Sequence, residues 1–227
     1  MTALRSGRRS PESKIRSMCS VVRRDNIDTY RTPALTEADA RWLRDEGFTV
    51  VQNLVVLQRD GRVTTPTKRD VQCRDVTSRH VLSERRSHLL TELLDIDAGS
   101  FPSPWNLDRR TFEHACRATS EHRVVLVGDA DNDLITAGYA IVGRVGVRSF
   151  LQRLAVHPAV RRRGVASALV HHASLWATGR GAETMLVNTE PSNHAALELY
   201  RTLGFDVLPD SYVVLERVVT MTPSVQS

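Results

Sequence analysis

Residues 154–167 carry the pattern in this sequence that is best suited to bind an anion. They read LAVHPAVRRRGVAS, which predicts an apolar strand, a short basic loop and the start of a long helix. A helix start presents unpaired N–H groups and the positive end of the helix dipole, so it favours phosphate. Gly164 lets the backbone approach a ligand closely, and Arg161, Arg162 and Arg163 add charge and paired donors. The segment predicts a pyrophosphate held mainly by main-chain amides, and a solvated basic helix start is the alternative.

Two strings in the second half of the chain resemble one known family. A P-loop or a dinucleotide fingerprint would need GxxxxGK[ST] or GxGxxG, and the sequence contains neither. Arg161-x-x-Gly164-x-Ala166, preceded by LAVHP, resembles the Q/R-x-x-G-x-G/A signature of the GNAT superfamily of acyl-CoA N-acyltransferases. Residues 193–205, NHAALELYRTLGF, resemble the N-x-x-A-x-x-L-Y-x-x-L-G-F segment of the same proteins. The resemblance covers about residues 87–218 and implies an N-acetyltransferase that uses acetyl-CoA as cosubstrate.

The resemblance also implies roles for individual residues. The strand before the loop would pair with the pantetheine arm, the loop amides would hold the pyrophosphate, and an asparagine would contact the cofactor. Tyr200 would give a proton to the departing thiolate, and a core aromatic is the alternative for it. The implied cofactor-binding residues are Leu154, Ala155, Val156, Arg161, Arg162, Arg163, Gly164, Val165, Ala166, Ser167 and Asn193.

The general base is where the sequence departs from the family. The strand at residues 149–156 contains no carboxylate, although many relatives carry a glutamate there. Asn188 stands where others carry a glutamate on the later strand, and Glu190 lies two residues along. The candidates are therefore Glu190, His194 and a water relay, and a surface role is the alternative for both side chains.

The acceptor side of the site is less legible. Residues 98–106, AGSFPSPWN, resemble the loop between the first two helices of ribosomal-protein alanine N-acetyltransferases. Phe101 and Trp105 would bound a pocket for an amine acceptor, either a peptide N-terminus or a small molecule. Simple packing of the helix pair is the alternative for Trp105, and antibiotic, polyamine and amino-acid acceptors all remain open.

Several helices and strands must position these residues. Apolar periodicity and glycine or proline breaks predict helices and strands of an α/β (α+β) protein, and the resemblance implies the GNAT fold. This is a mixed, mostly antiparallel central sheet flanked by helices, with an N-terminal helix-strand extension. The expected helices are residues 36–46, 87–98, 107–119 and 193–203 and a long one after Gly164, and the expected strands are residues 48–57, 124–127, 134–142, 149–156, 185–188 and 213–219.

A weak internal repeat suggests where the extension comes from. Residues 40–60 and 196–219 each read as a helix, a Gly-Phe break, an apolar strand and a second strand ending in Leu-x-Arg. A chance match is the alternative to a true duplication. The predicted organisation is a disordered basic tail at 1–34, a GNAT-remnant-like extension with a linker at 35–74, the GNAT domain at 75–219 and a disordered C-terminal tail at 220–227.

Composition limits the remaining classes of function. The 227 residues include 41% hydrophobic and 25% charged residues, which is ordinary for a soluble globular protein. No run approaches the roughly 20 apolar residues of a membrane helix. The three cysteines lack metal spacing and fit a reducing cytoplasm, so we expect no metal. An aromatic content of 5% and no recognised motif argue against specific nucleic-acid binding. We expect a monomer or homodimer, and a non-catalytic acyl-CoA sensor is the runner-up to an enzyme.

Overall fold

The computed structural model describes residues 15, 19–24, 27–61, 71–129 and 132–220. The chain divides into two compact units that interleave along the sequence. Unit 1 comprises Met1–Val56, Thr189–Ser192 and Leu208–Ser227, and unit 2 comprises Leu57–Asn188 and Asn193–Val207. These units do not follow the boundaries expected from the sequence, because two long strands each begin in one unit and end in the other. The strands are β4 (Thr49–Asp60) and β10 (Asp206–Thr220).

Unit 2 is built on a mixed sheet with one parallel pair in its centre. Antiparallel ladders join β5 to β6, β6 to β7 and β7 to β8, whereas β8 and β9 run parallel. β4 follows β9 in the strand order. This confirms the expected mixed, mostly antiparallel sheet. The strands are β5 (Cys73–Val76), β6 (Glu121–Asp129), β7 (Asn132–Val145), β8 (Arg148–Val156) and β9 (Thr184–Thr189).

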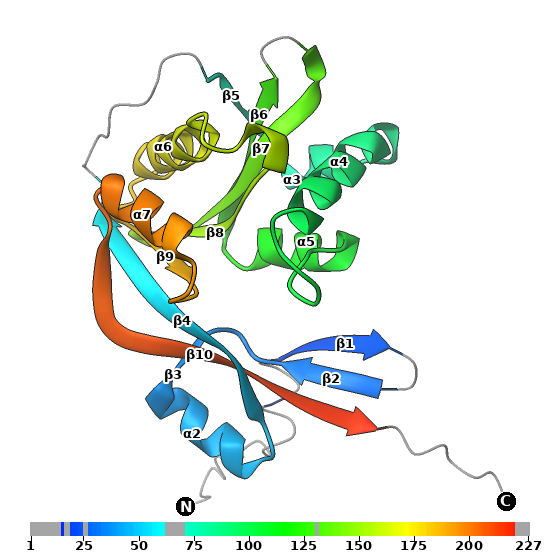
Figure 1. Cartoon of the computed structure of the whole chain (residues 1–227), viewed down its shortest axis with the longest axis vertical. Coiled ribbons are helices and arrows are strands. Elements are labelled where there is room, and N and C mark those ends of the chain that lie inside the picture. Colours follow the sequence, from blue (N-terminus) through cyan, green and yellow to red (C-terminus); the bar gives the residue numbers. More distant parts are fainter. Residues whose placement is uncertain (1–14, 16–18, 25–26, 62–70, 130–131, 221–227) are drawn as a thin grey trace, which may run out of the picture. The chain divides into compact units, whose positions relative to one another are not determined.

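Helices cover both faces of this sheet, as Figure 1 shows. One face carries α4 (Ser87–Ala98) and α5 (Arg109–Arg117), preceded by the short α3 (Ser78–Val81) and a 3-10 turn (Glu84–Arg86), and the other carries α6 (Val165–Thr178). Leucines of α4 spaced three or four residues apart bury one stripe against the strands, as periodicity predicts. The resulting core holds Leu89, Leu90, Leu93, Ile96, Phe112, Val124, Leu126, Tyr139, Ile141 and Ala155.

The ends of the helices follow from their capping residues. Asp108 caps α5 by accepting from the Thr111 amide at 2.7 Å, while the Thr111 hydroxyl accepts from the Asp108 amide at 2.8 Å. This reciprocal pair satisfies two donors that the first turn leaves open. At the other end of the sequence, α7 (His194–Thr202) is capped by Asn193, whose Oδ1 accepts from the Ala196 amide at 3.1 Å.

Unit 1 packs one helix, α2 (Glu37–Asp45), into a small core of its own. Its strands are β1 (Ser20–Arg24), β2 (Ile27–Arg31), the two-residue β3 (Leu35–Thr36) and the unit 1 parts of β4 and β10. β10 pairs antiparallel with both β2 and β3, and β2 pairs with β1. The buried side chains are Ile15, Tyr30, Ala40, Leu43, Phe48, Val213 and Leu215.

The expected disordered tail at residues 1–34 is wrong in its second half. Residues 20–24 and 27–31 form a hairpin, and its second strand pairs residue by residue with the end of β10, Glu216–Thr220 against Ile27–Arg31. A basic composition does not prevent a strand when a partner supplies the backbone hydrogen bonds. Residues 1–14 lie outside the described residues, as do 221–227 of the expected C-terminal tail.

The expected linker was also misjudged at both ends. Arg59 and Asp60 belong to β4, which runs three residues beyond the predicted strand end at Leu57, and Cys73–Val76 form an edge strand. Residues 62–70 between them lie outside the described residues. Turn-forming residues therefore marked only the middle of this segment, while polar strand ends paired on both sides of it.

Candidate active site

Strand β8 parts from its parallel neighbour β9 before it ends. The ladder between the two strands consists of Arg148↔Thr184, Ser149↔Met185 and Phe150↔Leu186. β8 nevertheless continues to Val156, and its register against β7 shifts at Gln152. A register shift of this kind adds one residue and bends the strand. The edge of β8 that faces β9 is therefore open around Leu154 and Val156, which suits pairing with an extended ligand.

The loop after β8 leaves the start of α6 without a side-chain cap. Arg162 has φ 65° and Gly164, the N-cap, has φ 88°, so the chain turns twice through the left-handed region. Gly164 has no side chain to accept from the first amides, and no other side chain in the described part of the chain caps them. The open N–H groups at the start of this 14-residue helix combine with its dipole to favour an anion.

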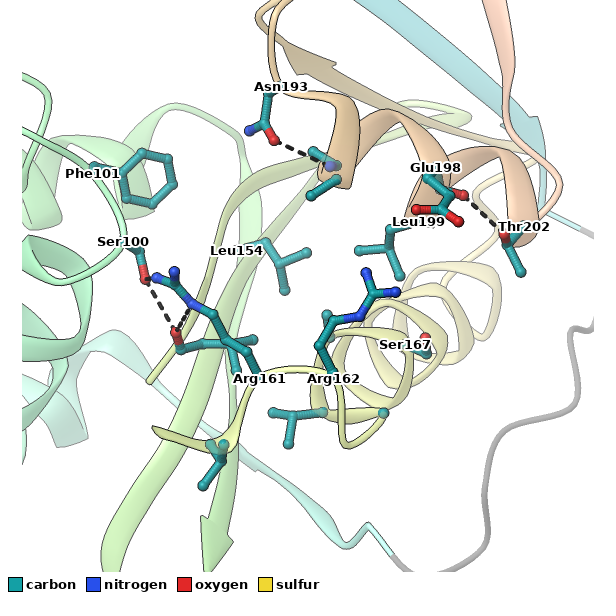
Figure 2. Close-up of a pocket in the computed structure, with 17 residues that line it drawn as sticks. Ser100, Phe101, Leu154, Arg161, Arg162, Ser167, Asn193, Glu198, Leu199 and Thr202 are labelled. Carbon is teal, nitrogen blue, oxygen red and sulfur yellow. Dashed lines mark hydrogen bonds between the residues drawn. The ribbon is translucent and has the colours of Figure 1, made fainter. Parts of the chain in front are cut away.

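One cavity of about 540 Å³ joins these features, all within unit 2. Figure 2 shows its walls: the end of β8, the loop with Arg161 and Arg162, the start of α6 and the length of α7. The lining residues that the sequence had identified are Phe101, Leu154, Val156, Arg161, Arg162, Gly164, Val165, Ala166, Ser167 and Asn193. The structure thus brings together most of the predicted cofactor site and one of the two predicted acceptor residues.

Sequence reasoning missed most of the wall that α7 supplies. Ala195, Glu198, Leu199 and Thr202 line the cavity at intervals of three, four and seven residues, which is one helix face. This spacing was the signal in the sequence that could have identified them. The other missed lining residues are Ser100, Val160 and Ala196.

Arg161 lines the cavity, but its guanidinium donates hydrogen bonds to main-chain carbonyls. Its Nη2 donates to the Gly99 carbonyl at 2.8 Å, and its Nε donates to the Val156 carbonyl at 3.3 Å. The Ser100 hydroxyl donates to the same Val156 carbonyl at 3.3 Å. Figure 2 shows Arg161 turned toward Ser100 and Arg162 turned toward α7. Arg161 therefore fastens the loop after α4 to the end of β8, which is a different arrangement from the expected phosphate ligand.

Four other predicted residues of unit 2 lie outside the cavity lining. Ala155 is buried among the side chains on the α4 side of the sheet, because successive strand residues point to opposite faces. Arg163 is exposed. Trp105 is half-buried, and its carbonyl accepts from Arg153 at 2.8 Å. Tyr200 is buried, with its ring centroid 5.6 Å from that of Phe205.

Asn193 lines the cavity and Tyr200 does not, although both were expected to serve the site. Asn193 is the N-cap of α7 and lines the cavity, whereas Tyr200 lies with Leu197 on the buried face of the helix. Burial raises the pKa of the Tyr200 phenol, which keeps it protonated at neutral pH. Within the described residues its hydroxyl forms no hydrogen bond, so its proton is not committed to another side chain.

Glu190 belongs to unit 1, and its partners there are known. One carboxylate oxygen accepts from Gln52 Nε2 at 2.6 Å, and the other accepts from the Ser192 hydroxyl at 3.4 Å. Both groups donate to the carboxylate, and they hold it in one orientation. His194, the other candidate base, is the first residue of α7 and is exposed.

A buried ionic network anchors the loop that carries Phe101, and the sequence analysis did not foresee it. Asp97 at the end of α4 is fully buried and accepts from Arg153, the Tyr139 hydroxyl and the Leu107 amide, each at 2.6 Å. The Arg153 guanidinium carbon also lies 3.4 Å from the centroid of the Phe101 ring. A charged residue in the middle of an apolar strand was the available signal, since such a charge needs a partner when buried.

The described residues contain no group of three or more His, Cys, Asp or Glu side chains placed to hold a metal ion. Of the helices in the described ranges, none has the length and apolar character needed to span a membrane.

Comparison of the chain with known proteins identifies a family. The model of the acetyltransferase (GNAT) family matches residues 90–205, which is half of the chain and contains every lining residue of the cavity. Aminoglycoside N(6')-acetyltransferase type 1 of Salmonella typhimurium is 35% identical over 57 residues, which are 25% of this chain and 39% of that protein. The chain thus spans about two fifths of the length of the curated relatives it matches.

Two solved structures show the same fold at low identity. A GCN5-related N-acetyltransferase from Sphaerobacter thermophilus has a TM-score of 0.57 at 16% identity, with 85% of this chain and 60% of that chain covered. A GNAT-family protein from Novosphingobium aromaticivorans has a TM-score of 0.55 at 15% identity, with 93% and 94% covered. The opened strand, the uncapped helix start and the matched family model agree, and the chain belongs to the GNAT acetyltransferase family.

Proposed function

We propose that the protein is an N-acyltransferase that moves the acetyl group of acetyl-CoA to an amine. The observation that carries this proposal is a cavity that combines an open β8 edge with the uncapped start of α6. In this proposal the amides from Gly164 to Ser167 hold the pyrophosphate, with Arg162 beside them. The pantetheine arm lies along Leu154 and Val156, and Asn193 contacts it from α7.

The reaction follows as a direct attack within a complex of both substrates. The neutral amine nitrogen forms a bond to the thioester carbon, the bond from that carbon to sulfur breaks, and the thiolate takes a proton. Positioning two bound reactants supplies much of the acceleration. A β8 amide, such as that of Val156, polarises the carbonyl, and Tyr200 gives the proton to the sulfur.

The cysteines support direct attack rather than an acetyl-cysteine intermediate. Burial raises the pKa of the Cys116 thiol to about 12 and that of Cys73 to about 11, and burial also raises the pKa of Cys19. A thiol with a raised pKa holds little thiolate at neutral pH and is a poor nucleophile. None of the three lines the cavity. All three are free thiols, which fits a reducing cytoplasm as the place of action.

We propose Glu190 as the general base, with His194 and a water relay as the alternatives. A carboxylate can accept the proton that the attacking amine loses, and the Glu190 carboxylate is held in place by Gln52 and Ser192. The carboxylate that many relatives carry on the strand before the loop is absent here, and Gln152 and Arg153 occupy the middle of that strand.

The acceptor is an amine of a peptide N-terminus or a small molecule. Phe101 supplies an aromatic wall at one end of the cavity, and the Asp97–Arg153 network holds its loop in place. Trp105 is placed on the same anchored loop as a further acceptor contact. The curated relative is named for an aminoglycoside amine, so aminoglycosides belong in the set of acceptors to test. The working form of the protein is a monomer or homodimer.

Calorimetry and a thiol-release assay test the proposal together. Acetyl-CoA should bind with one site per chain, and free CoA thiol should appear only when a suitable amine is present. The panel comprises peptides with different N-terminal residues, polyamines, amino acids and aminoglycosides. Binding without thiol release for every amine would favour the alternative, a non-catalytic acyl-CoA sensor. Absence of binding would refute both.

A further inference from the structure

One buried arginine from the N-terminal part of the chain contacts both helices of the cavity. Arg59 lies next to the end of β4 and is 2% exposed. Its Nη1 donates to the carbonyl of Leu203, the C-cap of α7, at 3.0 Å, and its Nη2 donates to the Ser174 hydroxyl on α6. Its guanidinium carbon lies 4.9 Å from the centroid of the Phe205 ring. All of these groups belong to unit 2.

The two helices joined by Arg59 both line the cavity. α6 begins at Gly164 in the phosphate-type loop, and α7 begins beside Asn193. Arg59 holds them together at the other end, because Leu203 follows α7 and Ser174 lies about 15 Å along α6 from Gly164. Since helices are stiff over this length, joining them at these two points constrains how far apart they lie along the cavity, where the cofactor would sit.

The same joint is built a second time, in unit 1. Arg217 Nη1 donates to the carbonyl of Glu46, the C-cap of α2, at 3.1 Å, and its guanidinium carbon lies 5.0 Å from the centroid of Phe48. Glu46 and Phe48 stand 157 residues before Leu203 and Phe205 in the repeat noted above.

The backbone of the two joints agrees as well. Gly47 has φ 80° and Gly204 has φ 81°. In each copy the phenylalanine amide donates at 3.0 Å to a carbonyl five residues earlier. This agreement supports a true duplication. It also shows that the chain uses the same contact twice: an arginine binds the carbonyl at the end of a helix and packs on a phenylalanine ring. Of the two copies, only the one in unit 2 connects helices that line the cavity.

We propose that Arg59 is a positioning residue of the acyl-CoA site. It acts through Leu203 and Ser174, by setting the separation of α6 and α7, and it touches neither substrate. The N-terminal extension therefore completes the site, because its strand β4 delivers this side chain. The inference rests on the proposed function, since it assumes that the cavity binds acetyl-CoA.

The test compares Arg59→Met with Arg217→Met in the full chain. Methionine keeps an unbranched side chain and removes the guanidinium donors at both joints. We expect Arg59→Met to raise the Kd and KM for acetyl-CoA about tenfold, with a smaller fall in kcat. Amide hydrogen exchange without ligand should become faster in the first turns of α6 and α7. Arg217→Met is the matched control, and its Kd should stay within about twofold of the wild type.

A conservative variant keeps the inference testable if Arg59→Met does not fold. Arg59→Lys retains the charge and one donor, but it cannot reach both helices with a planar fork, so its Kd should rise about threefold. An unchanged Kd with unchanged exchange in the Arg59 variants would overturn the inference, and so would an equal rise of Kd in Arg217→Met. If the wild type does not bind acetyl-CoA, the proposed function fails, while the exchange data still show whether Arg59 couples the two helices.

Discussion

Arg153 and Asp97 form a two-pronged ion pair between β8 and the end of α4. Arg153 Nε and Nη2 each donate to a different Asp97 oxygen at 2.6 Å, and the Asp97 side chain is fully buried. Arg153 also donates to the Trp105 carbonyl, and Asp97 accepts from the Leu107 amide. The pair therefore fixes both ends of the loop that presents Phe101.

Replacing Asp97 with asparagine should destabilise the protein strongly. The substitution keeps the size of the side chain and leaves the Arg153 charge buried without its counter-charge, which costs about 3–5 kcal/mol of unfolding free energy. Urea denaturation followed by circular dichroism measures this change. Asp95→Asn, on the exposed face of the same helix, is the control and should shift the free energy by about 0.5 kcal/mol or less. A comparable, small loss in both variants would contradict the role of the pair.

Gly164→Ala should weaken acetyl-CoA binding beyond its cost in stability. Gly164 has φ 88°, a conformation that costs about 1–2 kcal/mol for a residue with a Cβ, and the resulting strain would fall on the amides at the start of α6. Gly181→Ala is the matched control, because Gly181 has φ 83° and open space around it, and it does not line the cavity. Both variants should lose similar stability by thermal denaturation. Only Gly164→Ala should raise the Kd, by about tenfold or more in calorimetry.

Tyr200→Phe should lower kcat with little change in KM. If the Tyr200 hydroxyl protonates the leaving thiolate, its loss removes a general acid, which is typically worth about 10²–10⁴ in rate. The thiol-release assay at saturating acetyl-CoA measures this fall. Tyr212→Phe is the control. Tyr212 is a half-buried residue of β10, and this variant should retain full activity. A kcat for Tyr200→Phe within about twofold of the wild type would assign the residue to the core alone.

Burial of Tyr200 also predicts how stability depends on pH. Burial raises the folded-state pKa of this phenol above its usual value near 10. As the pH rises through 10, the unfolded chain loses this proton while the folded protein keeps it, so the unfolded state binds fewer protons and stability falls. The loss contributed by this group approaches about 1.4 kcal/mol per pH unit. Urea denaturation between pH 8 and 11 should therefore give a steeper decline for the wild type than for Tyr200→Phe, and equal slopes would refute it.

The sequence predicted the parts of this protein that depend on local patterns. The loop and start of α6 were legible because Gly164 and its neighbours determine backbone conformation and capping by themselves. Asn193 was found for the same reason, since a helix N-cap is a local feature. The bounds of helices α4 and α7 agree with the expected bounds to within one residue at each end.

Features that depend on a distant partner were not predictable in the same way. The hairpin at residues 20–31 exists because β10 lies beside it, almost two hundred residues later. Asp97 and Arg153 are 56 positions apart, and Arg59 and Leu203 are 144 apart. A sequence shows that such charges exist but not which buried group compensates each of them. The sequence indicates the repeat at residues 40–60. That Arg59 and Arg217 each bind the end of a helix in the other copy is evident only from the structure.

Glu190→Gln tests the remaining step of the proposed mechanism, which is loss of a proton from the amine. The amide keeps the shape of the side chain but cannot accept a proton, so kcat/KM should fall by about 10²-fold if Glu190 is the base. Glu183→Gln is a control at an exposed position of unit 2. An unchanged kcat/KM across the pH range would exclude Glu190 as the general base. His194→Gln would then be the next variant, because this substitution removes an imidazole base but leaves a water relay in place.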